Sequence, residues 1–549
     1  RNGYPPTVTL TAAGVASLLL CDDYLRGRGG LECTDNLADG DVERGLAWIG
    51  DNFDSIFDQP NRLCYALYGI ERIGAASGRK TFAGRDWYAT GAATLLDRQE
   101  NSGAWNEGND RVADTALALL FLVRGRAPVI MNKLDYSAGA DAATDQSNRR
   151  PRDLAHLSRW ISRTIEDNRP LNWQVVDYQD ADQTWHDAPI LYVCGRNAVQ
   201  FSDAQAGQIK RFIEEGGLVL FNADCGLGAP FVASVRKLGR QLFGADFRTL
   251  PADHPIFTAE EFHRNLWKNP PQLLGLSNGA RELMLLVPNA DLSAAWQTNT
   301  PLVRPEAFQL ATNIFLYAVD KQHLRSKGDS YLVQPDTEIK ATRTIKVARL
   351  NYGPGFDPEP GGWRRLAAVM HNQDGTDLNA APLTLGDGSL LSGGYAIAHL
   401  TGTAAFTLSP VQRAELHQYV TSGGTLVIDA AGGSRPFAAS ARNELNQIFP
   451  DAAAQLDTPL PIEHPFYMAV RDRIVGRDIA YRLFSRTVLS DLRQPRLRAI
   501  SIGARAAVYF SAEDLSVGLV GQEVDGIVGY TPALATRLME KIIDSSVNQ

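Results

Sequence analysis

The stretches Ala188-Pro-Ile-Leu-Tyr-Val-Cys-Gly195 and Gly217-Leu-Val-Leu-Phe-Asn-Ala-Asp-Cys-Gly226 decide the fold of this chain. Each contains a short apolar run with the length of a buried strand. The segment 203–215 between them has apolar residues at helical spacing, and Gly216 follows it as a left-handed helix C-cap. A strand, a helix and a strand in this order predict a parallel βαβ crossover.

This α/β block occurs twice, and an offset of 207 residues aligns the cores of the two copies. Self-similarity over such a long span is typical of a tandem duplication. We therefore predict two α/β domains, at 128–330 and 345–549, joined by a polar hinge near Lys327-Gly-Asp-Ser330. The positions that correspond are Gly195 and Gly402, Ser202 and Ser409, Gly216 and Gly423, His254-Pro255 and His464-Pro465, and Gly279-Ala-Arg281 and Gly503-Ala-Arg505.

Residues 1–127 have a different pattern, that of successive amphipathic helices separated by Gly-rich turns. This spacing predicts a domain of helical hairpins. The expected helices are Ala12–Leu25, Asp41–Phe57, Arg62–Ala76, Arg85–Arg98 and Asp110–Val123.

Composition excludes several classes of protein. The 549 residues include 54 basic and 62 acidic side chains, so a net charge of −8 gives no general attraction for nucleic acid. The apolar run Thr115–Val123 has about half of the ~20 residues that a spanning helix needs, and we expect no transmembrane span. Because the sequence begins at Arg1 rather than Met, either a leader was removed or the sequence starts inside a longer product.

The cysteines point away from a zinc framework. Their number is five, which is odd, and no pair has CxxC spacing. One disulfide among Cys21, Cys33 and Cys64 remains open. The basic run Arg149-Arg-Pro-Arg152 is interrupted by proline, and we expect it to be a solvated loop.

The motif Gln99-Glu-Asn-Ser-Gly103-Ala-Trp105 resembles the QW repeat of squalene cyclases and protein prenyltransferases. We expect a structural role, in which Gln99 bonds a neighbouring helix end and the indole of Trp105 covers a tight turn at Gly103. The resemblance implies the later part of an α/α toroid whose upstream helices are missing. The acid cluster and the zinc ligands of those enzymes have no counterpart, so neither activity carries over.

The helical hairpins, the segment Arg124–Tyr136 and the two strand motifs quoted above together resemble the bacterial family called domain of unknown function forty-one fifty-nine. Asp253-His-Pro-Ile-Phe257 and Ala311-Thr-Asn313 fit the same family. The resemblance implies class I glutamine-amidotransferase-like, flavodoxin-like domains and, since members usually carry export signals, a periplasmic or cell-envelope location. The family has no established activity.

One hypothesis for catalysis starts from Cys225, which follows an apolar strand as a nucleophile would in an amidotransferase-like fold. His254 would be its base, oriented by Asp253 or Asp224. The repeat argues against this, because Cys225 corresponds to Gly432 whereas the His-Pro pair is kept. A histidine that persists without a nucleophile favours a structural role, in which the imidazole bonds the backbone beside proline.

Short polar residues stand near the strand ends of both copies, Asn222 opposite Asp429 and Asp135 opposite Asn351. Open α/β sheets bind ligands at this edge. Without accompanying His or Cys spacing, we expect no metal and no cofactor there, and Asp and Asn also serve as turn formers and helix caps.

These observations favour a non-catalytic structural or interaction protein of the bacterial envelope, which would act as a multidomain assembly scaffold for other envelope proteins. Duplicated domains without duplicated reactive residues are expected when the shared property is shape. Two alternatives remain open: a Cys225-dependent hydrolase or amidase in the first α/β domain, and a helical toroid that binds lipid or glycan in its central cleft.

Overall fold

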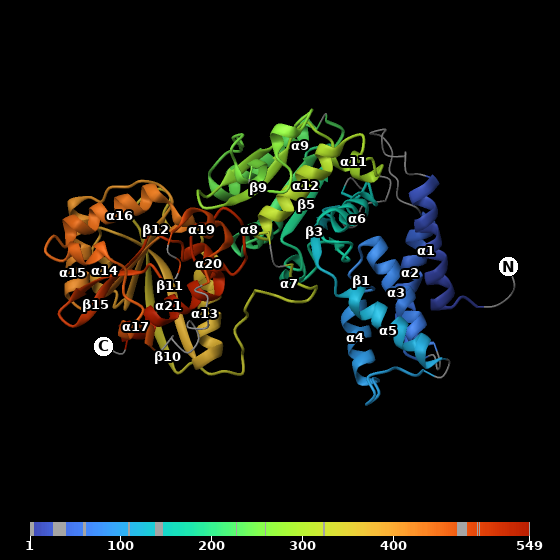
Figure 1. The fold of residues 1–549 in the computed structure, drawn as a ribbon, viewed down its shortest axis with the longest axis horizontal. Coiled ribbons are helices and arrows are strands. Elements are labelled where there is room, and N and C mark those ends of the chain that lie inside the picture. The colour runs from blue at the N-terminus through green and yellow to red at the C-terminus, as the bar shows by residue number, and fades with distance from the viewer. Residues whose placement is uncertain are drawn as a thin grey trace.

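The computed structural model describes residues 5–25, 40–58, 62–107, 110–137, 147–226, 228–258, 260–321, 324–468, 480–490, 492 and 495–547. Figure 1 shows three bodies in a row: a helical N-terminal part, a first α/β domain (copy 1) and a second α/β domain (copy 2). The predicted arrangement of a helical part followed by two α/β domains is confirmed.

The helical part contains the five predicted helices, with ends shifted by a few residues. Asp86 and Asp110 cap α4 and α5, because each carboxylate accepts hydrogen bonds from the first free backbone N–H groups. α3 lies at the centre of an apolar core, packed against α1, α4 and α5. The elements are α1 (Val8–Leu25), α2 (Gly40–Asp51), a 3-10 turn (Phe53–Ile56), α3 (Leu63–Ser77), β1 (Thr81–Phe82), β2 (Arg85–Asp86), α4 (Trp87–Asp97) and α5 (Arg111–Gly125).

By length and composition, α1 is apolar enough to cross a membrane, with a mean hydropathy of 1.4 over 18 residues. A signal sequence or a helix of a soluble core passes the same test. α1 also packs on α2 and α3, so the prediction of no spanning helix stays a prediction.

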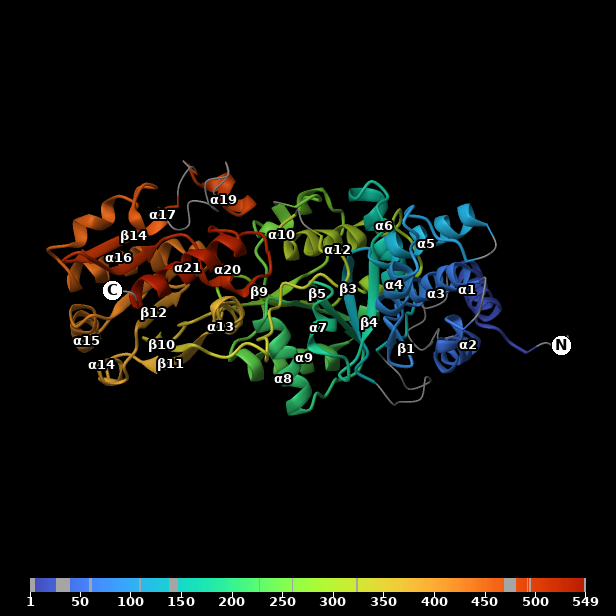
Figure 2. The same cartoon turned by 90° about the horizontal axis from the view of Figure 1, so that it is seen from below.

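Copy 1 is a seven-stranded sheet between two layers of helices. Figure 2 shows α8 and α9 below this sheet and α6, α10 and α12 above it. Its elements are β3 (Val129–Leu134), α6 (Asp153–Ile165), β4 (Asn172–Val176), α7 (Asp182–Trp185), β5 (Ile190–Gly195), α8 (Asp203–Glu214), β6 (Leu218–Ala223), a 3-10 turn (Asp224–Gly226), α9 (Ala229–Phe243), β7 (Arg248–Thr249), α10 (Pro255–Thr258), a 3-10 turn (Arg264–Leu266), β8 (Leu274–Ser277), β9 (Glu282–Val287), α11 (Leu292–Gln297) and α12 (Pro305–Ala318).

Copy 2 is a six-stranded sheet with the same layers. The predicted domain start at 345 falls inside its first strand. Its elements are β10 (Arg343–Asn351), α13 (Gly361–Asp374), β11 (Thr376–Thr384), α14 (Ser389–Ser392), β12 (Ile397–Gly402), α15 (Pro410–Thr421), β13 (Thr425–Ala430), a 3-10 turn (Ala431–Gly433), α16 (Arg435–Ile448), a 3-10 turn (Ala453–Asp457), α17 (Pro465–Met468), α19 (Leu483–Val488), β14 (Arg498–Ile502), β15 (Arg505–Ser511), α20 (Ser516–Val520) and α21 (Pro532–Val547).

The two sheets share one topology over six strands, and copy 1 adds a seventh, β7, antiparallel to β8. The strand order is β4-β3-β5-β6-β9-β8-β7 in copy 1 and β11-β10-β12-β13-β15-β14 in copy 2. In each, the first five strands of this order are parallel, and the hairpin β8–β9 or β14–β15 adds an antiparallel strand. The prediction of a tandem repeat with parallel crossovers is therefore confirmed.

Equivalent side chains also make equivalent bonds. Ser202 and Ser409 form the same capping box, with Gln205 and Gln412 respectively. Arg281 donates to the carbonyls of Ile213 and Gly217, and Arg505 donates to those of Val420 and Gly424, which are the same positions one repeat later. The duplication thus extends to hydrogen bonds that close the last turns of α8 and α15.

The segment predicted to be a polar hinge is anchored instead. Lys327 is buried, its ammonium lies 4.7 Å from the ring centroid of Trp87, and its N–H donates to the carbonyl of Arg126. Farther on, the hydroxyl of Tyr331 donates to the carbonyl of Glu215. The connection between the copies is therefore packed against both the helical part and copy 1.

Candidate functional site

The candidate site is the edge of each sheet where the parallel strands end, because open α/β sheets bind ligands there. After β6 the chain turns through Cys225, whose φ is 66°, and after β13 it turns through Gly432, whose φ is 67°. Both are left-handed conformations, which cost glycine little and other residues about 1–2 kcal/mol. Each turn residue donates its N–H to an aspartate, Asp291 or Asp514, at 2.8 Å.

In copy 1 a buried arginine occupies the space beneath this turn. The guanidinium of Arg150 forms ion pairs with Asp291 and, at 3.4 Å, with Asp224, and its Nη1 also bonds Ser293. Its Nη2 lies 3.7 Å from Sγ of Cys225. Arg150 therefore ties together the ends of β6 and β9.

The same network continues under β3. Lys133 bonds both carboxylate oxygens of Asp153 and the carbonyl of Arg150, and both side chains of the ion pair are buried. Burial raises the pKa of Asp224 to about 6 even though Arg150 opposes this change. Because each ionic group already has a partner of opposite charge, the network stabilises the strand ends rather than presenting free charge to a ligand.

Copy 2 replaces these ions with a histidine network. Nε2 of His399 lies 2.7 Å from Asp429, and Nδ1 of His399 accepts a hydrogen bond from the indole of Trp363 at 3.0 Å. An indole N–H can only donate, so Nδ1 is the acceptor in this bond and Nε2 is the ring nitrogen that faces Asp429. Burial acts to raise the pKa of Asp429, but the hydrogen bonds from His399 and from the backbone N–H groups of Leu515 and Ser516 together lower it.

Asp429 is saturated with donors. It accepts from the N–H groups of Leu515 and Ser516 and from the hydroxyl of Ser516. Ser516 therefore bonds the carboxylate, not the imidazole, which is not the order of a serine hydrolase triad. We interpret His399, a buried residue of β12, as part of the packing of that strand.

The strand-end edge of copy 2 is covered by copy 1. The turn between β8 and β9, residues 277–281, lies against it: Asn278 bonds the carbonyl of Pro358 and the carboxylate of Glu359, and its own carbonyl accepts from Thr403. A side chain on Gly432 would meet the Cα atom of Ala280 at 3.0 Å. Where a ligand would enter this fold, copy 2 holds a loop of its neighbour.

A buried ion pair secures this contact. Arg281 bonds both carboxylate oxygens of Glu359, at 2.8 and 3.2 Å, while both side chains are almost fully buried. The corresponding turn of copy 2, at Gly503 and Ala504, is exposed. The β8–β9 turn of copy 1 thus contacts copy 2, whereas the equivalent β14–β15 turn of copy 2 contacts no other domain within the described residues.

The strand-end edge of copy 1 is closed differently. Cys225 is disulfide-bonded, whereas Cys21, Cys64 and Cys194 are free. A cavity of about 750 Å³ lies beside Cys225, lined by the loops 269–272 and 289–291 and by the start of α12. A bridge within Cys21, Cys33 and Cys64, which the sequence left open, would need two of these residues and does not form because Cys21 and Cys64 are free. Cys33 lies outside the described residues.

The structure does not bring the proposed catalytic residues together. His254 lies 3.5 Å from Glu282, the first residue of β9, whereas Cys225 contacts Asp291, beyond the last residue of that strand. At about 3.3 Å per residue the six-residue β9 separates them by more than 15 Å. Asp253 is exposed, and its described bond is through its carbonyl.

The His-Pro pairs have the same local role in both copies. Nδ1 of His254 accepts from the N–H of Ile256, and Nδ1 of His464 accepts from the N–H of Phe466. This is the backbone-bonding role that the repeat predicted.

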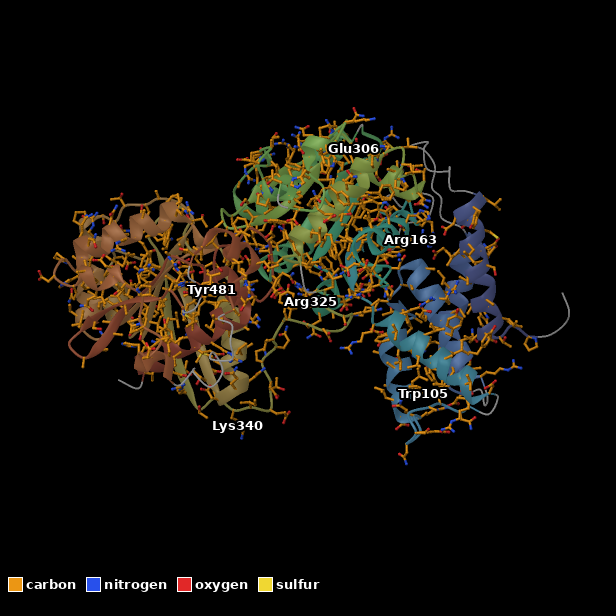
Figure 3. All side chains as sticks on the ribbon, in the orientation of Figure 1. Trp105, Arg163, Glu306, Arg325, Lys340 and Tyr481 are labelled. Carbon is orange, nitrogen blue, oxygen red and sulfur yellow. The ribbon has the colours of Figure 1, made fainter. Side chains whose placement is uncertain are left out.

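The QW-like motif ties α4 to the turn that follows it. Trp105 is buried, and its indole N–H bonds the carbonyl of Leu95 in the last turn of α4. Gln99 bonds the carbonyl of Gly103, whose φ is 83°. The helix end is therefore bonded by the tryptophan, and the glutamine closes the turn itself, a reversal of the expected roles. Figure 3 shows Trp105 in the lower part of the helical body, away from both sheets.

Sequence reasoning missed the residues that hold the strand ends. The run Arg149-Arg-Pro-Arg152 was expected to be a solvated loop, but Arg150 and Arg152 are 4% and 6% exposed. A signal was present, because the tripeptide Asp291-Leu-Ser293 recurs as Asp514-Leu-Ser516. Both aspartates accept the turn N–H described above, so a search of the repeat for kept polar residues finds them.

Fold and strand-end geometry define this chain as a tandem α/β protein with a helical N-terminal part. Residues 131–319 and 346–539 each match the family described as Domain of unknown function (DUF4159). Since the two matches cover more than half of the chain, the chain belongs to this family. No curated protein matches it.

Proposed function

We propose that the protein is a non-catalytic scaffold of the bacterial cell envelope, in which the paired α/β domains form one rigid unit and the helical part contacts other envelope proteins. The observation that carries this proposal is the hairpin 277–281 of copy 1, which fills the strand-end edge of copy 2. Because the chain itself fills this edge, the edge holds the two α/β domains together and leaves no room there for a substrate.

The junction between the copies supports a rigid unit. Besides the Arg281–Glu359 pair, Arg364 pairs with Glu214 at 3.0 Å, and Gln522 bonds both the carbonyl of Ala318 and the guanidinium of Arg325. Figure 3 places Arg325 where the first and second domains meet. Bonds distributed over several elements restrict the relative motion that a small interface would permit.

The helical part provides the contact surface. Most of the exposed large apolar side chains of the described residues lie in this part, and apolar surface outside a core marks interaction sites. On α5 they follow helical spacing along one exposed face. They are Leu10, Leu20, Tyr24, Leu25, Tyr65, Leu96, Val112, Leu119, Leu120 and Val123.

The envelope location rests on the family resemblance and on the disulfide at Cys225, because disulfides persist in oxidising compartments. We also infer that the α/β domains are of the flavodoxin-like, amidotransferase-like type, since their first four strands have the order 2-1-3-4 of such sheets. The helical part we infer to be related to α/α toroids through its hairpins and its QW-like turn.

Crosslinking in the native cells tests the scaffold. The expected result is a defined complex that the double variant Leu119→Glu, Leu120→Glu abolishes and that Val411→Glu, an exposed change on α15, leaves intact. A protein that remains monomeric and uncrosslinked, or a complex that survives the α5 variant and the control alike, contradicts the proposal.

A further inference from the structure

Two cavities meet where the helical part contacts copy 1. The first has a volume of about 720 Å³ and a mostly apolar wall formed by α4, the end of α5 and the segment around Leu324. The second, of about 370 Å³, lies between α1, α3, α6 and β4. Both volumes are in the range of about 300–1,000 Å³ that is typical of small-molecule sites. Pro170 and Leu171 line both cavities, so they adjoin.

The larger cavity exposes apolar side chains to solvent. Leu96 and Val123 line it and are 64% and 62% exposed, with Ala92, Leu122 and Tyr88 beside them. Large apolar groups at the mouth of a cavity are stabilised when a ligand covers them.

The smaller cavity is positively charged. Four arginines line it, Arg72, Arg124, Arg152 and Arg159, against two carboxylates, Asp23 and Glu71. Asp23 pairs closely with Arg152, whose Nε lies 2.7 Å away, and with His156, whereas Nη2 of Arg159 lies farther off, at 3.9 Å. The remaining groups carry an excess of positive charge whether or not Glu71 is ionised.

Among the described residues, two buried polar atoms at this cavity have no hydrogen-bond partner: Oε2 of Glu71 and Nε1 of Trp173, on side chains that are each 3% exposed. An indole N–H donates only, so it requires an acceptor. Burial raises the pKa of Glu71 to about 7 although Arg124 and Arg72 oppose this, and the protonated carboxyl is also a donor. The arginines, the indole and this carboxyl together are complementary to oxygen atoms that carry negative charge.

We propose that the two cavities form one binding site for a single-chain anionic amphiphile, with its apolar chain along Leu96 and Val123 and its carboxylate or phosphate head among Arg72, Arg124 and Arg159. The helices α4 and α5 line the larger cavity, α6 and β4 line the smaller one, and Figure 2 shows these elements at the boundary between the helical part and copy 1. The site lies at the boundary of the helical part and not in the centre of its helices, where α3 is packed.

Titration calorimetry on the full chain tests this proposal with decyl phosphate, decanoate, 1-decanol and inorganic phosphate, each below its micelle concentration. We expect decyl phosphate or decanoate to bind at least about tenfold more tightly than both decanol and phosphate, since chain and head each contribute. The better of the two anions identifies the head group. Equal binding of decanol, or equal binding of phosphate alone, overturns the proposal.

Matched variants locate the site. Arg159→Glu should weaken binding of the preferred anion about tenfold or more because it removes a charge-assisted bond, and Arg163→Glu, an exposed change on the same helix, should leave it within about twofold. Val123→Asp should weaken binding by a similar factor, whereas Val112→Asp, exposed elsewhere on α5, should not. Arg159 and Val123 are exposed enough for the variants to fold, which circular dichroism checks. Binding that is unchanged in both cavity variants places the ligand elsewhere and refutes the site.

Discussion

The strand-end edges of copy 1 and copy 2 share one backbone and differ in what closes them. In copy 1 a cysteine takes the left-handed position and is disulfide-bonded above an arginine network. In copy 2 a glycine takes the same position, and the hairpin of copy 1 lies directly on it. The comparison shows that duplication kept the turn and its aspartate, whereas the groups above the turn diverged. A reactive centre would have required those groups to stay together.

The largest expected effect concerns the ions of copy 1. Arg150→Met leaves the buried Asp224 and the partly buried Asp291 without their partner, which should lower the free energy of unfolding by about 3–5 kcal/mol. Arg163→Met, exposed on α6, should change it by less than about 0.5 kcal/mol. Urea unfolding, monitored by tryptophan fluorescence, measures the free energy of unfolding of both variants. Equal values for the two variants would mean that the Arg150 network does not stabilise the strand-end edge of copy 1.

A smaller effect should separate the two equivalent arginines. Arg281→Met loses the buried pair with Glu359 in addition to the carbonyl bonds that Arg505→Met also loses. We expect the first variant to cost about 2–3 kcal/mol more than the second. Amide exchange should locate the difference at the junction near residues 358–362. Identical losses would show that the hairpin contact contributes nothing.

The third effect on stability concerns the turn at Gly432 in copy 2. Gly432→Ala places a methyl group in a left-handed conformation and against Ala280, for a cost of about 2 kcal/mol. Gly503→Ala has the same backbone strain, with φ of 63°, but open space around it. Thermal unfolding should show a larger loss of stability for Gly432→Ala than for Gly503→Ala, and the difference measures the contact with copy 1. Equal losses would mean that the hairpin of copy 1 does not lie against Gly432.

The smallest effect is on pH dependence. Burial raises the pKa of Asp224 to about 6 and that of Asp514 to about 7. A group with a raised pKa holds its proton in the folded chain after the unfolded chain has lost it, so stability falls as pH rises from about 4 to the folded pKa. Between pH 6 and 7 Asp514 contributes up to about 1.4 kcal/mol to this fall, beside Glu71, Asp320 and Glu260, whose pKa values burial raises to about 7, 7 and 9.

Asp514→Asn should therefore flatten the stability profile between pH 6 and 7, and Asp224→Asn should flatten it only below pH 6. Unfolding curves at half-unit pH steps measure the slopes. A profile between pH 6 and 7 that Asp514→Asn leaves unchanged would contradict the assignment.

The sequence predicted the helices, the strands and the duplication because these depend on local periodicity and on small motifs that align. It did not predict which loop covers which edge, since the contact of Asn278 with Glu359 joins residues of different domains. The burial of Arg150 was missed for a related reason. From sequence alone a basic run is expected to be exposed to solvent. The carboxylates that pair with Arg150 lie about 70 to 140 positions farther along the chain, so the sequence near Arg150 does not reveal them.

The hypothesis about Cys225 and His254 shows where local reasoning fails. Cys225 follows the end of β6 as expected, but His254 lies at the opposite edge of the sheet, and strand ends at opposite edges are distant even when their loops look alike. Which edge of the sheet a loop lies on depends on the direction in which the chain enters the next strand. The apolar pattern of the sequence does not specify that direction.

One crosslinking measurement tests most directly whether copy 1 covers the edge of copy 2. In a chain with Ala280→Cys and Gly432→Cys, a Cβ at 432 lies 3.2 Å from the Cβ of residue 280, close to the ~3.5–4.5 Å of disulfides. We predict that mass spectrometry of the oxidised protein finds the 280–432 bridge, with a free thiol at 432 in the single variant Gly432→Cys. Two free thiols in the double variant would mean that the edge of copy 2 is open, which would contradict the account.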